Sequence, residues 1–409
     1  MDDQITERAV IAAVDIGAYD IENALAELRS LCETAGAEVV GEIVQRRDRP
    51  DRFAYLGTGK LEEAQQLCET LEAGLLVVDA ELSGVKLRNL EEAVGVPVID
   101  RTTLILDIFA RAATTAEGQL QVELAQWEYR LPRLTGAGKA LSRLGGGIGT
   151  RGPGESKLEH DRRYIRTRMS MLKERLAELE KRRAQTRRSR KRGGVPIVAL
   201  AGYTNVGKSS LLNALTGSEV LAEDKLFATL DPTARRLAVG DLQQVILIDT
   251  VGFVSRLPHA LVEAFQSTLE EIVYADLIIK VADASSAFWS DQLAVASSVL
   301  DELGCSDIPS ITVFNKCDLI DTSAALPGLP VSAVTGQGLG QLLAEVSKCL
   351  SERVVRCTVK LPFDQLALAA VIREHGNVIS EEYLADGVLI TATISRAVYN
   401  RIEPYATGI

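Results

Sequence analysis

The order of hydrophobic and polar residues predicts alternating strands and helices in the first hundred residues. Short apolar runs rich in β-branched residues are separated there by amphipathic stretches with a helical period. The predicted strands are 8–16, 37–44, 75–80 and 96–100, and the predicted helices are 19–36, 59–74 and 83–95. Strands that alternate with helices indicate βαβ units, so we expect a small parallel sheet in a subdomain spanning 1–101.

The pattern changes between residues 102 and 192. Two narrow apolar seams repeat every three or four residues, at Leu120, Leu124, Trp127 and Leu131, and at Ile165, Met169, Leu172, Leu176 and Leu179. Such seams are typical of paired helices, so we predict a long antiparallel helical hairpin. Pro132 should end the first arm, and GESKLE (154–159) should begin the second. The stretch between the arms is too rich in glycine for either helix or strand, and it forms the predicted tip loop.

The rest of the chain divides into two further parts. Residues 193–352 alternate again between buried strands and helices, which predicts a second α/β domain. Residues 353–409 contain two strand patterns, 353–361 and 387–395, with a helical pattern at 364–376 between them. We expect this last part to be a small α+β appendage, so the whole chain is predicted to be a multidomain α/β protein.

Composition agrees with several folded domains. A chain of 409 residues with 46% hydrophobic and 25% charged residues is too long for one ordinary core. It has no apolar run of the ~18 residues that a membrane helix needs, and its first residues lack the features of a signal peptide. The six cysteines form no Cys-x-x-Cys pair and are not spaced with histidine for zinc. We therefore expect reduced, structural thiols and a cytoplasmic location.

Charge is distributed unevenly along the chain. The net charge is −11, yet residues 151–192 contain sixteen Lys/Arg and six Asp/Glu, a local charge of +10 that leaves −21 on the remainder. A basic block in an acidic protein indicates a localised contact with a polyanion. The alternative is a solvated helix face with no partner.

A phosphate loop is the clearest motif. In PIVALAGYTNVGKSSLLNAL, the pattern Gly202-x-x-x-x-Gly207-Lys208-Ser209 follows a predicted strand and opens a predicted helix. Glycines let backbone N–H groups turn toward phosphates at the positive end of the helix. Lys208 should reach the β- and γ-phosphates, and the Ser209 hydroxyl should bind Mg²⁺.

The nucleotide base is predicted from VFNKCDL. This strand ends in Asn315-Lys316-Cys317-Asp318, and the Asp318 carboxylate can accept both N1–H and the 2-amino group of guanine. Asn315 should tie the loops together, and the Lys316 stem should cover the ring. VSAV (331–334) should supply a backbone contact from Ser332-Ala333 to guanine O6. The predicted ligand is GTP.

Two switch segments lie between these motifs. FATLDPT (227–233) offers Thr229 or Thr233 for Mg²⁺ and the γ-phosphate, and LIDTVG places Asp249 at a strand end near the metal. The Gly252 N–H should point at the γ-phosphate. This order of motifs is that of a small GTPase, so residues 193–352 are predicted to be a P-loop GTPase domain.

Several segments together resemble the HflX family of ribosome-associated GTPases, nearly from end to end. They are YLGTGKLEE (55–63), GGGIGTRGPGESKLE (145–159), GYTNVGKSSLLNAL, LFATLDPT and DTVGFVSRLP. The resemblance implies that Thr229, and not Thr233, is the Mg²⁺ threonine. One departure is Lys280, where related sequences tend to have histidine. The full set expected to contact the nucleotide is Gly202, Tyr203, Thr204, Asn205, Val206, Gly207, Lys208, Ser209, Phe227, Ala228, Thr229, Leu230, Asp231, Asp249, Thr250, Val251, Gly252, Asn315, Lys316, Cys317, Asp318, Ser332, Ala333 and Val334.

Phe253 raises a question about catalysis. It occupies the position where many GTPases carry a glutamine that orients the attacking water, and its side chain can neither donate nor accept a proton. Either the protein binds GTP without cleaving it, or Lys208, Thr229 and Gly252 act in a slow hydrolase that a partner accelerates. Arg235, Arg236 and Arg256 lie near the switches as candidate charge stabilisers, although each can equally be a surface arginine.

Two glycine-containing stretches outside the GTPase motifs need separate interpretations. GTGK (57–60) lacks the full phosphate-loop spacing, and a turn that caps the following helix explains it. The family resemblance nevertheless implies that the N-terminal part could have an adenine-nucleotide activity. The hairpin tip is a better candidate for RNA, because cations on a flexible backbone suit RNA phosphates. The candidate RNA contacts are Lys139, Arg143, Arg151 and Lys157.

We therefore expect a GTPase that binds ribosomes in its GTP state. The resemblance implies a site on the large ribosomal subunit near the peptidyl-transferase centre, and a role in splitting or rescuing stalled or idle ribosomes. We expect a monomer. We also expect no stable membrane association, because the basic stretch 181–192 has no apolar face to bury in a bilayer. The alternative is an RNA-binding scaffold for ribosome assembly that uses GTP as a switch without turnover. A GTPase that binds anionic membranes is a third, weaker alternative.

Overall fold

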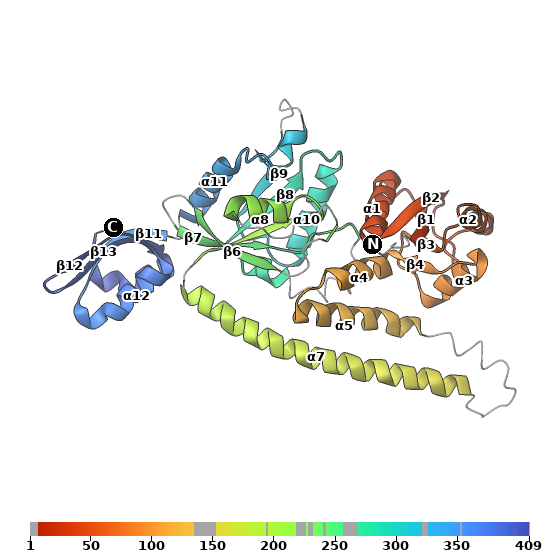
Figure 1. The fold of residues 1–409 in the computed structure, drawn as a ribbon, viewed down its shortest axis with the longest axis horizontal. Coiled ribbons are helices and arrows are strands. Elements are labelled where there is room, and N and C mark those ends of the chain that lie inside the picture. The colour runs from red at the N-terminus through yellow and green to blue at the C-terminus, as the bar shows by residue number, and fades with distance from the viewer. Residues whose placement is uncertain are drawn as a thin grey trace, which may run out of the picture. The chain divides into compact units, whose positions relative to one another are not determined.

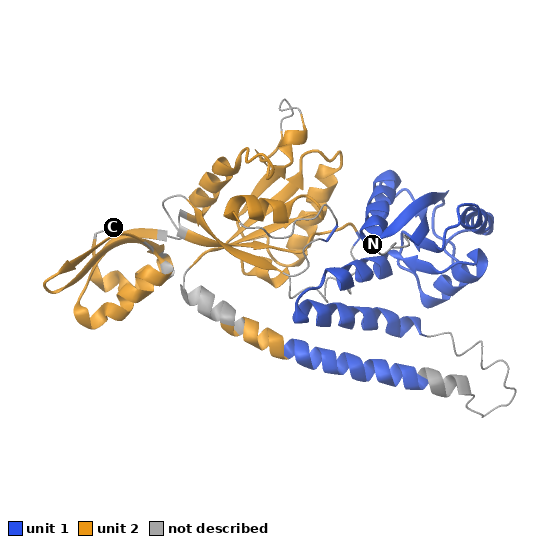
Figure 2. Cartoon of the chain, viewed as in Figure 1, with its two compact units in different colours: residues 1–177, 225–227, 256–265 blue, residues 178–224, 228–255, 266–409 orange. Residues whose placement is uncertain are grey.

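The computed structural model describes residues 7–134, 153–193, 195–217, 226–227, 232–239, 243–256, 269–320, 326–351 and 354–408, and Figure 1 shows their fold. The chain forms two compact units (Figure 2). The N-terminal unit contains residues 1–177, 225–227 and 256–265, and the C-terminal unit contains residues 178–224, 228–255 and 266–409. Two short segments that follow the phosphate loop in sequence therefore belong to the N-terminal unit.

The N-terminal unit is built on the predicted parallel sheet. Its strands have the order β2-β1-β3-β4 and are all parallel: β1 Glu7–Asp15, β2 Ala37–Arg46, β3 Leu75–Val78 and β4 Val98–Asp100. The helices are α1 Ile21–Thr34, α2 Thr58–Thr70, α3 Gly84–Val94 and α4 Arg101–Ala112. Seven of these elements were predicted, and α4 was missed. Its apolar residues are nearly contiguous in RTTLILDIFARA, so no helical period is visible there.

This sheet is buried because its strands are apolar on both faces. Residues 9–13 of β1 are fully buried, as expected for a central parallel strand covered by helices. Asp20 caps α1 by accepting the backbone N–H groups of Glu22 and Asn23, which fixes where the helix begins. The strand ends bring two fully buried carboxylates, Asp79 and Asp100, to one edge of the sheet.

Two helices occupy the predicted arms of the hairpin, and Figure 1 shows them running antiparallel. They are α5 Ala116–Arg133 and α7 Pro153–Gly193, so α5 continues one residue beyond Pro132. Arg168 donates two hydrogen bonds to Glu123, at 2.7 and 2.9 Å, and Leu172 of the predicted seam is fully buried. In the described part of the chain, no helix has the length and apolarity to cross a membrane.

The C-terminal unit contains a six-stranded sheet of order β10-β9-β8-β5-β7-β6. Neighbouring strands are parallel except for β6, which is antiparallel to β7. The strands are β5 Ile197–Gly202, β6 Thr233–Val239, β7 Gln243–Asp249, β8 Leu277–Asp283, β9 Ser310–Asn315 and β10 Leu329–Pro330, and the helices are α8 Lys208–Thr216, α10 Trp289–Glu302 and α11 Leu339–Ser351. Because β5 lies between β7 and β8, its carboxyl end is next to the ends of both neighbours.

The same unit ends in a four-stranded antiparallel sheet of order β12-β13-β11-β14. Its elements are β11 Val354–Leu361, α12 Leu366–His375, β12 Asn377–Leu384, β13 Gly387–Ser395, α13 Arg396–Ile402 and β14 Ala406–Gly408. The two predicted strands and the predicted helix are present. β12 was missed because NVISEEYL is too polar for a strand pattern to stand out, and β14 is only three residues long.

All six cysteines are free thiols, and five of them are buried. Burial raises the pKa of Cys32 to about 12, and it also raises the pKa of the other five. A thiol with a raised pKa is a poor nucleophile at neutral pH. The thiols are unpaired, as expected for reduced cysteines, and the five buried ones pack as small apolar residues.

Candidate nucleotide-binding site

The phosphate loop turns between β5 and α8, at the centre of the six-stranded sheet. β5 ends at Gly202 and α8 begins at Lys208, with Asn205 and Gly207 at positive φ angles of 60° and 85°. A Cβ atom on Gly207 would lie 2.3 Å from Nδ2 of Asn315, so only glycine fits there. The loop is thus shaped by close approach to the strand end that carries Asn315.

Lys208 is a buried cation surrounded by backbone carbonyl groups. Its side chain is only slightly exposed, and Nζ donates to the carbonyl oxygens of Tyr203 at 2.8 Å and Gly202 at 3.2 Å. Burial lowers the pKa of Lys208 to about 8, while the charge of Asp249 acts in the opposite direction. An anion bound in the loop would stabilise the charged form of this side chain.

Ser209 and Asp249 meet beside this lysine. Ser209 Oγ donates to Oδ2 of Asp249 at 2.6 Å, and Asp249 is fully buried at the end of β7. A hydroxyl and a carboxylate at a strand end are oxygen donors of the type that Mg²⁺ prefers. Oγ1 of Thr204 in the phosphate loop is buried and has no hydrogen-bond partner among the described residues. The donor set therefore fits a nucleotide phosphate together with Mg²⁺.

The segment after Asp249 runs along the phosphate loop. The N–H of Phe253 donates to Gly202 O at 3.0 Å, and the N–H of Thr204 donates to Phe253 O at 2.8 Å. A Cβ atom on Gly252 would lie 2.8 Å from Cα of Thr204 and 3.0 Å from Nζ of Lys208. Phe253 thus contributes backbone hydrogen bonds, its side chain is buried, and glycine is required at position 252.

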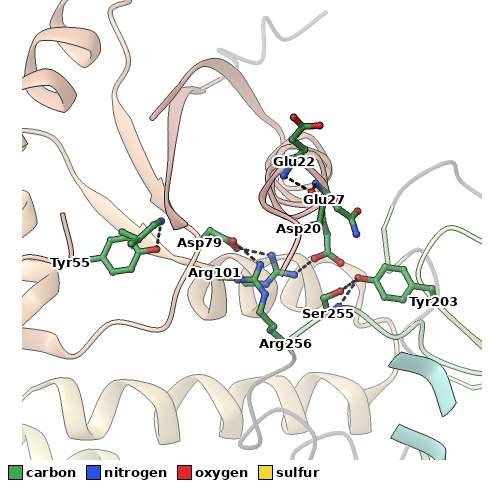
Figure 3. A network of polar contacts seen from close by, with 11 residues as sticks. Asp20, Glu22, Glu27, Tyr55, Asp79, Arg101, Tyr203, Ser255 and Arg256 are labelled. Carbon is green, nitrogen blue, oxygen red and sulfur yellow. Dashed lines mark hydrogen bonds and ion pairs between the residues drawn. The ribbon is translucent and has the colours of Figure 1, made fainter. Parts of the chain in front are cut away.

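Two further contacts hold the residues that follow, as Figure 3 shows. The backbone N–H of Ser255 donates to the Tyr203 hydroxyl at 2.6 Å. Within the N-terminal unit, Arg256 donates to Oδ2 of Asp79 at 2.7 Å, and its guanidinium lies 4.2 Å from the ring centroid of Tyr19. Arg101 donates to the other oxygen of the same buried carboxylate at 2.9 Å.

The three candidate charge-stabilising arginines therefore have different surroundings. Arg256 is held by Asp79, a carboxylate without exposed surface. Arg235 and Arg236 are exposed on β6, where they donate to Ala234 O and to Gln244 Oε1. These two fit the surface alternative.

The base-recognition segment is tied to the phosphate loop by Asn315. Its Nδ2 donates to Val206 O at 2.9 Å, and its Oδ1 accepts the N–H of Ala333 at 3.1 Å. The Ala333 N–H, expected to contact guanine O6, is thus engaged by Asn315. Asp318 is exposed in the short 3₁₀ turn Cys317–Leu319.

Lys316 has two partners near the phosphate loop. Its Nζ donates to Asn205 O at 2.9 Å and pairs with Asp283 at 2.7 Å. Asp283 was not among the predicted site residues. Its position at the end of β8, next to two strand ends that carry predicted site residues, is the signal that could have identified it.

Several predicted site residues are placed elsewhere or lie outside the described residues. Phe227 belongs to the N-terminal unit, where its ring packs edge-on against Phe109 with centroids 4.5 Å apart. Lys157 lies on α7, and only its backbone is described. The residues outside the described part are Ala228, Thr229, Leu230, Asp231, Lys139, Arg143 and Arg151. The remaining predicted nucleotide contacts are Thr250, Val251, Cys317 and Ser332, which are buried, and Val334, which is exposed.

Known proteins resemble the chain over its whole length. Four family models match, described as GTP-binding GTPase N-terminal (residues 22–110), GTP-binding GTPase Middle Region (112–190), 50S ribosome-binding GTPase (197–316) and HflX C-terminal domain (321–402). GTPase HflX of Caldanaerobacter subterraneus is 47% identical over 98% of this chain and 94% of its own. GTPase HflX of Escherichia coli K12 is 42% identical over 84% of this chain and 82% of its own.

Solved structures resemble it more distantly. A GTP-binding protein from Sulfolobus solfataricus in complex with GDP is 23% identical, covers 85% of this chain and 99% of its own, and aligns with a TM-score of 0.44. The family is established by the relatives in sequence, which match almost the full length of the chain. With a phosphate loop, a guanine-type recognition segment and these relatives, the chain belongs to the HflX family of GTPases.

Proposed function

We propose that this GTPase binds the large ribosomal subunit in its GTP state, and that the subunit accelerates an otherwise slow hydrolysis. Its target on the subunit is ribosomal RNA, and the outcome is the splitting or rescue of stalled or idle ribosomes. The protein acts as a monomer in the cytoplasm and makes no stable membrane contact. The observation that carries the proposal is the match of residues 197–316 to a family described as 50S ribosome-binding GTPases, in a chain that has a complete phosphate loop.

The geometry supports specific roles for the nucleotide residues. Lys208 neutralises the β- and γ-phosphates, since it is already buried beside the loop that receives them. The Gly252 N–H donates to the γ-phosphate, because this residue lies against Lys208 and Thr204. Asp318 selects guanine by accepting N1–H and the 2-amino group, while Asn315 fixes the recognition segment to the loop.

Ser209 and Thr229 are the proposed Mg²⁺ ligands. Ser209 lies beside the buried carboxylate of Asp249, which would stay close to the metal without being one of its proposed ligands. When bound, Mg²⁺ would neutralise negative charge on the β- and γ-phosphates.

Phe253 explains why hydrolysis needs a partner. Its buried side chain offers no group that can orient water, and its backbone groups are used by the phosphate loop. A GTPase with a glutamine at this position still gains ~10⁵-fold from its activating partner. The water-orienting group must therefore come from outside this segment, and the ribosome is the proposed source.

The test is GTP turnover by the purified protein alone, with large subunits and with whole ribosomes. We expect strong stimulation by large subunits, and its loss in Lys208→Ala. Lys348→Ala is the matched control, because it removes an exposed lysine far from the loop in sequence. Tight GTP binding without turnover under any of these conditions would overturn the proposal in favour of the assembly scaffold.

A further inference from the structure

The loop that joins β2 to α2 exposes an aromatic ring on a basic segment. We call residues 46–54 the Arg-Phe loop. Its first seven residues, RRDRPDR, contain four arginines and two aspartates. At its tip the Phe53 residue is 69% exposed, which makes it one of the most exposed large apolar residues in the described part of the chain. The proposed function assigns no role to this ring.

Hydrogen bonds within the loop hold the tip in one conformation. Asp51 Oδ1 accepts the N–H groups of Phe53 at 2.8 Å and Ala54 at 3.3 Å, and Asp51 N donates to Tyr55 O at 2.8 Å. The hydrogen bond from Phe53 is the main cause that lowers the pKa of Asp51 below its ordinary value, with smaller contributions from Ala54 and Arg47. The loop is therefore an Asx turn closed by backbone pairing.

The base of the loop is anchored in the N-terminal core. Tyr55 is buried at a positive φ of 66°, and its hydroxyl accepts the N–H of Val14 at 2.9 Å (Figure 3). Gly57 N donates to Gln45 Oε1 at 2.9 Å, and Asn89 of α3 donates to Phe53 O at 2.8 Å. The YLGTGK segment thus fixes the loop and starts α2, whose N-cap is Gly57.

The loop holds Tyr55 in a strained backbone conformation and holds the Phe53 ring in solvent. Both features cost folding free energy. Single exposed apolar residues are ordinary on protein surfaces. Here the exposed ring also stands on a hydrogen-bonded turn in a segment with four arginines. Arg46 has a side chain 90% exposed, and Arg49 and Arg52 are exposed as well.

We propose that Phe53 stacks on an unpaired base of ribosomal RNA while Arg46, Arg49 and Arg52 contact the flanking phosphates. This inference rests on the proposed function and names a contact for it. Single-stranded RNA is bound by aromatic platforms beside cationic grooves, because every base has a π-face and every linkage a negative charge. The hydrogen-bonded turn lowers the entropy cost of ordering the backbone that carries the ring on binding.

The test measures binding of the full chain to two probes. One is a fluorescein-labelled single-stranded RNA dodecamer of mixed sequence, followed by anisotropy, and the other is purified large subunits, followed by co-sedimentation. Phe53→Ala should weaken dodecamer binding about tenfold, and Phe53→Trp should restore it. Arg49→Ala should reduce the slope of log affinity against log salt by about 0.7. Tyr383→Ala is the matched control, because Tyr383 is 67% exposed on β12.

Each result decides between the alternatives. If Phe53→Ala and Phe53→Trp weaken dodecamer binding equally, with unchanged Tm, the stacking inference is wrong. If only large-subunit binding falls, the ring does not stack on an unpaired base, and the stacking inference is wrong. Subunit-stimulated GTP turnover in the wild type together with unchanged binding by Phe53→Ala would refute this inference alone. Failure of the wild type to bind either probe would overturn both this inference and the proposed function.

Discussion

Nucleotide affinity should fall as pH rises from 7 to 8.5, because Lys208 loses its proton in this range when the site is empty. Burial lowers its pKa to about 8 in the structure. Phosphate oxygens next to Nζ favour the charged form, which returns the pKa to about 10.4 or above in the complex. Binding is therefore at full strength below the pKa of the empty site and weakens as pH rises through it.

The size of the effect follows from the two pKa values. Between pH 7 and 8.5 the fraction of empty sites with a charged lysine falls about fourfold, and the association constant for GDP or GTP falls by the same factor. At pH 8 binding should take up about half a proton per nucleotide. Isothermal titration calorimetry in buffers of different ionisation enthalpy measures both quantities.

Lys208→Arg is the matched control for this experiment. Its guanidinium stays charged throughout the range, so its affinity, whatever its absolute value, should not change between pH 7 and 8.5. A wild-type affinity that stays constant over this range, without proton uptake, would show that the lysine is already charged in the empty site. The proposed role of burial at Lys208 would then be wrong.

Three substitutions test other parts of the structure. Asp318→Asn should weaken GTP binding by about 100-fold through loss of two charge-assisted hydrogen bonds, and binding should recover with xanthosine triphosphate, whose 2-oxo group accepts from the new amide. Asp79→Asn should destabilise the N-terminal unit by about 3 kcal/mol in thermal denaturation, whereas Asp386→Asn, in an exposed pair, should leave Tm unchanged. Leu172→Ala should lower the free energy of unfolding by about 3 kcal/mol and reduce hydrogen-exchange protection in α5 and α7. Unchanged protection would show that this buried leucine does not hold the two helices together.

Hydrophobic periodicity predicted most of the fold because most elements are amphipathic or uniformly buried. The seven predicted elements of the N-terminal sheet begin and end within a few residues of their observed limits. The missed elements depart from these patterns in ways that have physical causes. α4 is buried on most of its surface, so it lacks a polar stripe. β12 is an edge strand on which Ser380 and Glu382 are exposed.

The nucleotide site could be predicted from the sequence because its chemistry depends on short contiguous motifs. Lys208, Ser209 and Asn315 can each be identified from the residues beside them in sequence. In the structure, Lys208 and Ser209 begin α8, and Asn315 at the end of β9 bonds to the phosphate loop that precedes them. Asp283 and the Tyr203–Ser255 contact could not be predicted in this way, because each joins segments that are distant in sequence. Only the sheet order shows that these segments meet.

Phe227 and Arg256 show where local rules fail most clearly. Both have positive φ, 57° and 52°, which costs a residue other than glycine about 1–2 kcal/mol. Such backbone persists only where the surroundings enforce it. The ring of Phe109 packs against Phe227, and Asp79 and Tyr19 contact Arg256, all within the N-terminal unit. These contacts hold the two residues in their strained conformations. Phe227 and Arg256 lie two and four residues from Thr229 and Gly252, the proposed contacts of Mg²⁺ and the γ-phosphate. The two strained residues are therefore close in sequence to proposed nucleotide contacts, and the residues that pack against them belong to the N-terminal unit.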